Sequence, residues 1–422
     1  MTDNPIVRFE TLDLQPELLK AVEALGFTQC SDIQARSLPI TLQGADLIGQ
    51  AQTGTGKTAA FLLSILNHLL TSPEPSPRYA SEPRALVLAP TRELALQIEA
   101  DAKDLAKFTS LQVTSAVGGM HLGKQQQRLR DNVVDLLIAT PGRLIDFESR
   151  KDVYLDFVEI LVIDEADRML DMGFIPDVRK IVRKTPMKGD RQTLLFSATF
   201  NTGVRRLADS WTENPHNVEI APTQVATDTV EQKVYMVSEE EKLIVLFNLL
   251  HSNEAEKAIV FTNRRDQTRN LSTALQSLGM KCGVLSGDVP QPKRIKVLDQ
   301  FKSGHTPILI ATDVAGRGIH IDDITHVVNF YLPDDPEDYV HRIGRTGRAG
   351  SHGVSVSFAS EDDAFNLPDL ETYLGKKIDM EHPPAYLLKA LPHAPKRAER
   401  ERSRPRHSQS HSRHRNQPRG RR

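Results

Sequence analysis

The sequence is poor in cysteine and has no long hydrophobic run. Its 422 residues include only two cysteines, Cys30 and Cys282, which lie far apart and form no CxxC or metal-like spacing. We expect two reduced thiols in a cytoplasmic protein, and a bridge between them is the open alternative. No apolar run approaches the roughly 18 residues of a membrane helix. The N-terminus has neither the basic start nor the apolar stretch of a secretory signal. We therefore expect no membrane span and a cytoplasmic location.

The charge is nearly balanced overall but is distributed unevenly. The formal net charge is −2, although residues 396–422 hold eleven Lys or Arg and only two acidic residues. Because this end is also of low complexity, and hydrophobic periodicity fades after about Ala385, we predict a disordered basic tail over residues 386–422. Such tails commonly bind polyanions, so nucleic acid is the expected partner. A solvated end with no fixed partner is the alternative.

Most of the chain alternates apolar strand-like runs with longer amphipathic stretches. A first series of expected strands lies at 46–49, 84–90, 134–140, 159–165 and 192–199, and a second at 257–263, 282–287, 307–313, 325–333 and 353–360. Near-continuous apolar strands with helices between them indicate parallel sheets covered on both faces. The predicted fold class is therefore α/β.

The two series of strands indicate two domains. We expect them at residues 1–220 and 229–385, joined by a polar linker at 221–228. Within the first domain, the Pro- and Ser-rich segment 71–84 is expected to be an exposed loop.

The segment AQTGTGKT has the pattern of a phosphate-binding loop. It follows an expected strand and precedes an amphipathic run, which is the context that this motif requires. Its glycines let backbone amides face phosphate oxygens, and the helix N-terminus adds its positive end. Lys57 can reach the β- and γ-phosphates, and Thr58 can bind Mg²⁺. The alternative is a glycine-rich turn that only opens a helix. The predicted nucleotide site comprises Ala51, Gln52, Thr53, Gly54, Thr55, Gly56, Lys57 and Thr58.

Three acidic residues directly follow the apolar run FVEILVI. Asp164, Glu165 and Asp167 stand within four positions, and carboxylates so close to a buried strand need a compensating cation. Ligands of parallel sheets bind beyond the C-terminal ends of the strands, so this strand end and the phosphate loop can reach one crevice. We expect Asp164 to hold Mg²⁺ and Glu165 to orient or deprotonate the attacking water. An acid-rich helix N-terminus is the alternative.

Residues Asp164 to Asp167 read DEAD, and the chain resembles the DEAD-box RNA helicases, which are ATP-dependent enzymes with two RecA-like domains. The resemblance runs from about Phe9 to about residue 375, with the family's motifs in the family's order. These motifs are GFTQCSDIQ (26–34), PTRELA (90–95), Gly118-Gly119, TPGR (140–143), SAT (197–199), IVFTN (259–263), QPKR (291–294), ATDVAGRGIHI (311–321) and YVHRIGRTGRAG (339–350). The resemblance implies ATP and Mg²⁺ as cofactors, and RNA-stimulated ATP hydrolysis that closes a cleft and opens short RNA duplexes.

On the ATP side, the resemblance assigns roles to five more residues. It implies that Gln34 pairs with adenine, that Phe27 stacks on the ring and that Phe9 is the upstream aromatic residue of this motif. Arg345 and Arg348 resemble arginine fingers, which reach the γ-phosphate only when the cleft closes.

The chain departs from the family pattern at two positions. Asp32 stands where a proline is usual, which bears on the placement of adenine. His320 stands where the family commonly has an aspartate that can contact the ribose. Because histidine is neutral or cationic, we predict that His320 weakens or re-tunes ATP-dependent closure.

The resemblance also implies that RNA is gripped through its backbone, a contact that carries little sequence information. The residues expected to bind RNA are Pro90, Thr91, Arg92, Gly119, Thr140, Pro141, Gly142 and Arg143 in the first domain and Thr262 and Thr312 in the second. Residues expected to couple the ATP site to the other domain are Asp167, Ser197, Thr199 and His341. Arg342 is expected to help join the two domains.

Within the family, the stretches YLPDDPEDYVHRIGRTGRAG and EDDAFNLPDLETYLG and the Arg-rich end resemble the helicase of bacterial RNA degradosomes. That resemblance implies a role in RNA degradation, an endoribonuclease scaffold that docks on the second domain, and a protein that is a monomer by itself. The alternatives are another bacterial subfamily acting in ribosome assembly or cold adaptation, a DNA helicase or remodeller, and an ATP-gated RNA clamp.

Overall fold

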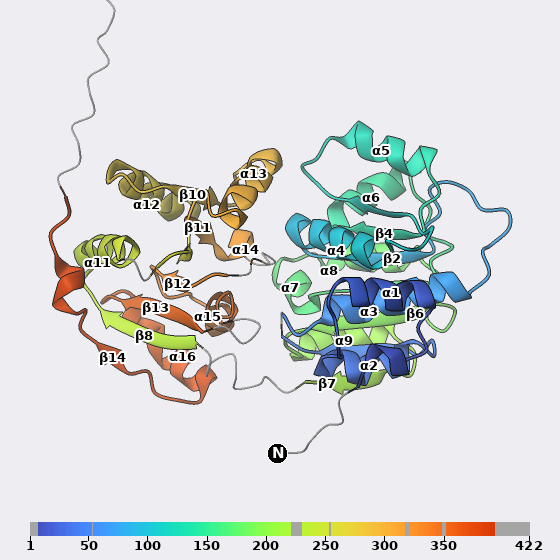
Figure 1. The fold of residues 1–422 in the computed structure, drawn as a ribbon, viewed down its shortest axis with the longest axis horizontal. Helices are drawn as coiled ribbons and strands as arrows, with labels where there is room; N and C mark the ends of the chain where they lie inside the picture. The colour runs from blue at the N-terminus through green and yellow to red at the C-terminus, as the bar shows by residue number, and fades with distance from the viewer. Residues whose placement is uncertain are drawn as a thin grey trace, which may run out of the picture.

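The computed structural model describes residues 7–52, 54–220, 230–252, 255–316, 321, 323–347 and 352–392. Two lobes lie side by side, each built on a seven-stranded parallel sheet (Figure 1). Within the described ranges, no helix is both long enough and apolar enough to cross a membrane. Cys30 and Cys282 are free and lie in different lobes. The expected α/β class is confirmed.

The first sheet has seven strands, and the predicted ATP-binding motifs follow three of them. Its strands are β1 (Leu47–Gln50), β2 (Ala85–Leu88), β3 (Val113–Ala116), β4 (Leu136–Ala139), β5 (Ile160–Ile163), β6 (Gln192–Ser197) and β7 (His216–Glu219). Their order across the sheet is β3-β4-β2-β5-β6-β1-β7. The central strands are apolar and buried because helices cover both of their faces.

Helices of the first lobe form two layers over this sheet. One apolar core lies under α1 (Pro16–Ala24), α2 (Asp32–Thr41), α3 (Lys57–Thr71) and α4 (Arg92–Leu105). The other lies under α5 (Leu122–Asp131), α6 (Pro141–Ser149), α7 (Ala166–Asp171), α8 (Ile175–Val182) and α9 (Thr202–Trp211). Alternate strand residues face opposite cores, as Val87 and Leu88 do. A 3₁₀ turn, η1 (Phe9–Thr11), precedes α1.

The second sheet has the order β10-β11-β9-β12-β13-β8-β14. Its strands are β8 (Val230–Met236), β9 (Ala258–Thr262), β10 (Cys282–Leu285), β11 (Ile308–Thr312), β12 (His326–Asn329), β13 (Gly353–Ala359) and β14 (Met380–Glu381). Its helical elements are α11 (Glu239–His251), α12 (Arg265–Ser277), α13 (Gln291–Lys302), α14 (Asp313–Gly316), α15 (Pro336–Ile343), η2 (Asp363–Phe365), α16 (Leu367–Leu374) and η3 (Ala385–Leu388).

All ten expected strands are present, and four further strands lack the signal on which the prediction relied. These four are β3, β7, β8 and β14. β7 reads HNVE and has one buried residue of four, whereas β8 reads VEQKVYM and has three consecutive polar residues. A search for continuous apolar runs misses such strands, because strands at the edge of a sheet or next to it tolerate polar side chains.

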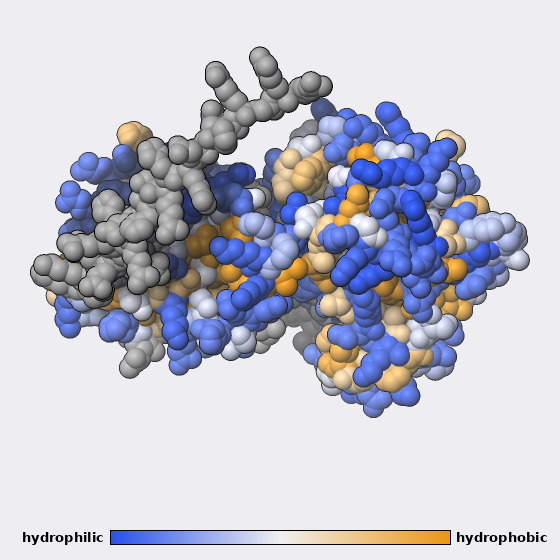
Figure 2. Space-filling view, turned by 90° about the horizontal axis from the view of Figure 1, so that it is seen from above, coloured by the Kyte–Doolittle hydropathy of each residue, from blue (hydrophilic) through white to orange (hydrophobic). Residues whose placement is uncertain are grey.

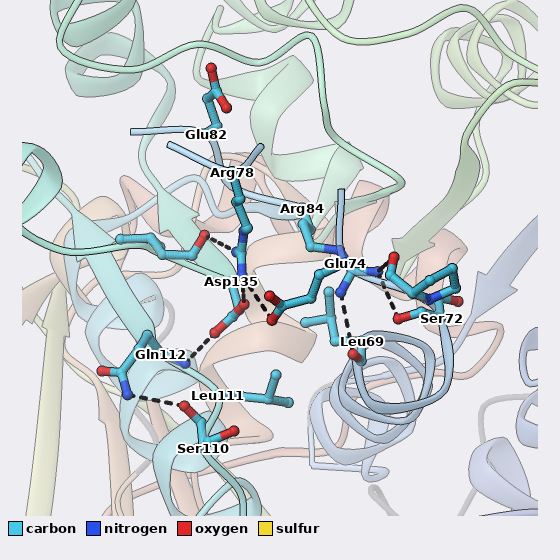
Figure 3. Close-up of polar contacts among 12 residues, drawn as sticks. Leu69, Ser72, Glu74, Arg78, Glu82, Arg84, Ser110, Leu111, Gln112 and Asp135 are labelled. Carbon is cyan, nitrogen blue, oxygen red and sulfur yellow. Dashed lines mark hydrogen bonds and ion pairs between the residues drawn. The ribbon is translucent and has the colours of Figure 1, made fainter. Parts of the chain in front are cut away.

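The segment 71–84 is only partly the exposed loop that we predicted. Tyr79 is 60% exposed, but Arg84 is 1% exposed. Figure 3 shows Arg78 pointing at Asp135, with a guanidinium-to-carboxylate distance of 2.6 Å. Arg84 Nε lies 2.6 Å from Glu159 Oε1. The two arginines tie the middle and the C-terminal end of this segment to the amino-terminal edge of the sheet.

The second lobe extends beyond its predicted boundary at residue 385. Leu387 is fully buried against α11, and Asn248 Nδ2 donates to the carbonyl oxygens of Leu387 and Lys389 at 2.9 and 2.8 Å. The predicted start of the tail at residue 386 is therefore too early. The predicted linker 221–228 and residues 393–422 of the predicted tail lie outside the described residues.

Candidate nucleotide and RNA site

The strand order of the first sheet separates two groups of motifs. The phosphate loop, the DEAD residues and the SAT residues follow β1, β5 and β6, which are neighbours in the sheet. PTRELA, Gly118-Gly119 and TPGR follow β2, β3 and β4, which are also neighbours. Because all strands run parallel, both groups emerge at the same edge. One half of this edge thus carries the nucleotide-type loops and the other half the RNA-type loops.

The phosphate loop wraps around the amino end of α3. Lys57 is 6% exposed, and its Nζ donates to the carbonyl oxygen of Ala51 at 2.6 Å. The Thr55 hydroxyl closes the turn by donating to the carbonyl oxygen of Gln52 at 2.8 Å. Gly56 has a φ of +93°, and a Cβ there would collide with the Gln34 side chain. Position 56 therefore requires a glycine, because its backbone is left-handed and because no room exists for a Cβ atom.

A cavity of about 320 Å³ opens beside the phosphate loop. That volume is within the range of small-molecule sites. Its lining includes residues predicted for the nucleotide and for Mg²⁺, namely Phe27, Gln34, Gly54, Gly56, Lys57, Thr58, Asp164 and Glu165. The structure therefore brings together most of the predicted ATP site, while Thr53 lies outside the described residues.

The residues expected to read adenine lie at one end of this cavity. Gln34 Nε2 donates to the carbonyl oxygen of Gly56 at 3.1 Å, and its Oε1 accepts from the Ser31 amide at 2.9 Å. Phe27 is 42% exposed in the cavity wall, whereas Phe9 is buried behind it, with the two rings stacked at 6.5 Å. Phe9 therefore supports Phe27, and its own ring is not part of the cavity wall.

The carboxylates after β5 are buried but differ in environment. Asp164 is 3% exposed, and burial raises its pKa. The positive charge of Lys57 lowers this pKa but offsets only part of the rise. Burial also acts on Glu165, but the positive charge and hydrogen bond of Arg168, at 2.7 Å, outweigh it and lower the Glu165 pKa. A buried carboxylate such as Asp164 is stabilised in its charged form by a nearby cation. The Asp164 oxygens and the Thr58 hydroxyl are hard donors of the kind that Mg²⁺ prefers, so the residues present fit that ion.

Asp167 links the DEAD residues to the SAT turn. Its Oδ2 accepts from the amides of Ala198 and Thr199 at 2.9 and 2.8 Å and from the Thr199 hydroxyl at 3.2 Å. The Asp167 amide donates to Ser197 Oγ at 3.2 Å. The predicted contact between SAT and the acidic strand end is thus present in the structure.

Residues of the second lobe complete the site from the opposite side. A small cavity between the lobes is lined by Lys57, Glu165 and Asp167 from the first lobe and by His341 and Arg345 from the second. Arg345 is 3% exposed and contributes to the lowered pKa of Glu165.

Two of the residues that the resemblance assigned to the ATP site, Arg348 and His320, lie outside the described residues. Their predicted roles, as an arginine finger and as a contact to the ribose, stay predictions.

The expectation that Arg342 joins the two domains is wrong. Arg342 is 1% exposed, and its guanidinium donates to Asp313 at 2.6 and 2.7 Å. It also donates to Asn263, Asn329 and the carbonyl oxygen of Tyr331. All these partners belong to the second lobe, so Arg342 holds that lobe together.

The RNA-type loops of the first lobe contact one another. The Gly118 amide donates to Thr140 Oγ1 at 3.4 Å, and the Arg92 side chain lies against Gly119. Arg143 is partly buried over the Phe147 ring at 5.4 Å. Of the remaining predicted residues, Pro90, Thr91 and Pro141 are buried and Gly142 is exposed. The buried side chains of Pro90, Thr91 and Pro141 contribute to the packing of the loops on which they lie.

The two residues of the second lobe that are expected to bind RNA lie at the ends of neighbouring strands. Thr262 and Thr312 end β9 and β11 and are paired in register. Thr262 is fully buried, and its hydroxyl bonds to Thr268 at 2.8 Å, so its side chain is turned inward and its RNA contact stays a prediction. Thr312 is 7% exposed, and its RNA contact stays a prediction.

One contact between the lobes had no predicted role. Arg294 of QPKR and Glu93 of PTRELA form an ion pair at 2.7 Å, with both side chains less than 10% exposed. Gln291 bonds to Glu93 at 3.2 Å and to Arg92 at 3.4 Å. Both motifs are recognisable in the sequence, but nothing in their spacing indicates that residues 201 positions apart meet.

The structure has two parallel-sheet domains, with a phosphate loop on the first and an arginine of the second close to it. This arrangement is that of a protein with two RecA-like domains that share a nucleotide site. Residues 31–207 match the DEAD/DEAH box helicase family, and residues 241–350 match the helicase conserved C-terminal domain. The chain is 56% identical to the ATP-dependent RNA helicase RhlB of Pseudomonas syringae pv. tomato and 57% identical to that of Pseudomonas aeruginosa. Each match covers 91% of this chain and 97% of the relative. The chain therefore belongs to the DEAD/DEAH box helicase family.

Solved structures support the same assignment. S. cerevisiae Dbp5 bound to RNA and ADP BeF3 has a TM-score of 0.78 at 35% identity, covering 89% of this chain and 95% of that chain. Mss116p bound to ssRNA and AMP-PNP has a TM-score of 0.81 at 29% identity, covering 92% and 82%. Both similarities span the two RecA-like domains together.

Proposed function

We propose that this chain couples ATP hydrolysis beside its phosphate loop to the local opening of short RNA duplexes. Its family and its RhlB relatives make it an ATP-dependent RNA helicase. The observation that carries the mechanism is that Lys57 and Glu165 line both cavities, and that Arg345 of the second domain lines the smaller one. Closure of the domains therefore assembles the site.

The roles at the nucleotide follow from these positions. The phosphate loop holds the phosphates, and Gln34 with Phe27 faces the adenine. Thr58 and Asp164 hold Mg²⁺, which neutralises phosphate charge. Glu165, kept ionised by Arg168, orients or deprotonates the attacking water. Arg345, with Arg348 as the predicted second finger, stabilises charge on the γ-phosphate.

The RNA contacts are proposed on the other half of the same edge. Arg92, Gly119, Thr140 and Arg143 lie on three neighbouring loops, which suits a sugar–phosphate backbone crossing them. Thr312 is the proposed partner in the second domain. Asp167 and the SAT turn are proposed to couple the nucleotide to the second domain, whose His341 lines the same small cavity as Asp167.

We further propose a cytoplasmic role in RNA degradation, with an endoribonuclease scaffold bound to the second domain. The support is the similarity to proteins named RhlB over nearly their whole length. The domains are proposed to extend over residues 1–220 and from 229 to about 388, with a linker at 221–228 and a basic tail beyond.

ATPase measurements with and without RNA, and with and without the candidate endoribonuclease, test this function. We expect strong stimulation by RNA and a further increase with the endoribonuclease. Equal stimulation by RNA and DNA would favour a DNA helicase or remodeller. Full cellular function of a protein that cannot turn over ATP would favour an RNA clamp.

A further inference from the structure

Glu337 is an acidic residue at the domain interface that the assigned roles do not use. It lies in α15, with a side chain that is 23% exposed, and faces Thr199 and Asp167 of the first domain. Its buried Oε1 has no hydrogen-bond partner within the described part of the chain. The His341 Nε2 atom is 3.8 Å from this oxygen, which is beyond hydrogen-bond distance.

Two carboxyl groups, those of Asp167 and Glu337, face the single proton of the Thr199 hydroxyl at this contact. The Thr199 hydroxyl has one proton, which it donates to Asp167 Oδ2. The SAT amides of Ala198 and Thr199 donate to the same oxygen. An ionised carboxylate only accepts hydrogen bonds, so an ionised Glu337 competes with Asp167 for the Thr199 proton. While that proton stays on Asp167, Glu337 can bond to the Thr199 oxygen only if Glu337 carries a proton of its own.

Charges around Glu337 favour that proton. Burial, followed by the charge of Asp167, raises the Glu337 pKa to about 7, against the opposing effect of hydrogen bonding from Thr199. Asp171 and Asp335 add to the rise. The titratable and charged groups of the elements packed around Glu337 are Asp167, Arg168 and Asp171 from α7, Asp335, Asp338, His341 and Arg345 from α15 and its flanks, and Tyr373 from α16.

We propose that Glu337 is a positioning residue that takes up a proton from solvent when the two domains close. The neutral carboxyl group donates to the Thr199 hydroxyl oxygen, while the Thr199 proton stays on Asp167. This chain of hydrogen bonds joins the second domain to the SAT turn and, through Asp167, to the acidic residues of the ATP site. The inference rests on the proposed closure around ATP and RNA.

The proton makes closure depend on pH in one direction. In the open protein, Glu337 faces water and has an ordinary carboxyl pKa, whereas closure raises this pKa. Closure is therefore favoured as pH falls below the raised value, by up to about tenfold per pH unit until the ordinary value is reached. Above the raised value, Glu337 is ionised in both states and opposes closure without a further pH slope.

Full-length protein tests this prediction by its RNA affinity with a non-hydrolysable ATP analogue and Mg²⁺, at pH 6.0 and 8.0. Wild type and the control Glu256→Gln, which changes an exposed glutamate, should bind RNA about tenfold more tightly at pH 6.0 than at 8.0. Glu337→Gln, which imitates the neutral carboxyl group, should bind tightly at both pH values. Glu337→Ala should also lose the slope but bind more weakly than Glu337→Gln.

Two results would overturn the proposal. One is a Glu337→Gln protein that keeps the wild-type slope. The other is a Glu337→Gln protein that binds no more tightly than Glu337→Ala at either pH, which would reveal a merely structural role. If the ATP analogue fails to tighten RNA binding by the wild type at any pH, the proposed function itself fails, so the two failures are distinguishable.

Discussion

At Glu165, backbone and side chain are both held in place by neighbours. Its φ of +51° is unusual for a residue with a side chain and costs about 1–3 kcal/mol. The ion pair with Arg168 holds the carboxylate in the cavity and keeps it charged. Strain of this kind is typical of functional sites, and it supports the role of Glu165 toward water.

Glu165→Gln tests that role. Because glutamine keeps the shape but cannot accept a proton, we expect kcat for ATP to fall about 10²- to 10⁴-fold. RNA affinity with an ATP analogue should change little. The control is Glu148→Gln, which removes a carboxylate paired to Lys184 on the surface. Unchanged turnover of Glu165→Gln, measured by phosphate release, would contradict the assignment.

At the scale of elements, α3 connects the nucleotide site to the opposite edge of the sheet. It begins at Lys57 in the phosphate loop, and its last carbonyl groups meet Arg84, which donates to the oxygens of Leu69 and Ser72 at 3.3 and 3.4 Å (Figure 3). Burial opposes ionisation of Glu159, but hydrogen bonds and charges of His68 and Arg84 lower its pKa to about 2. Arg84 therefore acts as a buried C-terminal cap for α3.

Arg84→Met is expected to destabilise the first domain by about 3–5 kcal/mol, because Glu159 and the helix carbonyls lose their donor. Urea unfolding measures this change. Arg150→Met is the matched control, since it breaks an exposed pair with Asp146 and should cost less than about 1 kcal/mol. A loss as small as that of the control would show that the cap contributes little.

Across the whole molecule, the two domains meet through charged residues as well as through the ATP site. In the view from above, the visible surface of the first lobe is mostly hydrophilic, with hydrophobic patches between the polar residues (Figure 2). At the junction, the Glu93–Arg294 pair is almost fully buried. Removing one partner of such a pair leaves an uncompensated buried charge. The pair therefore favours the arrangement of the domains in which the Glu93 and Arg294 side chains meet.

Charge reversal tests this interface. Glu93→Arg and Arg294→Glu should each weaken RNA binding with an ATP analogue by about tenfold or more, because like charges then face each other. The double reversal should recover part of the affinity. Fluorescence anisotropy with labelled RNA measures the effect. Additive losses in the double variant would show that the pair does not form in the RNA-bound protein.

The basic tail should add RNA affinity that depends on salt rather than on sequence. Removal of residues 396–422 takes away eleven Lys or Arg. We expect weaker RNA binding, with basal ATPase unchanged. The salt slope should be flatter by about 0.7 for each RNA phosphate that the tail neutralises in the full-length protein. A neutral Gly/Ser tail of equal length is the control. The same slope in the truncated protein would contradict this prediction.

The sequence by itself determined the class of fold and the ATP site, because both depend on local order. A short apolar run predicts a buried strand whatever its neighbours in the sheet are. A phosphate loop needs only a strand before it and a helix after it. The motifs thus led to Lys57, Asp164 and Glu165, which the structure brings to one cavity.

Tertiary structure decided which distant residues meet. Whether Arg342 joins the domains or stays within one depends on partners that no spacing reveals, and the same holds for Glu93 with Arg294. Burial decided two further properties, since it encloses the Thr262 side chain and raises the pKa of Glu337. These outcomes depend on long-range packing, which local patterns along the chain do not specify.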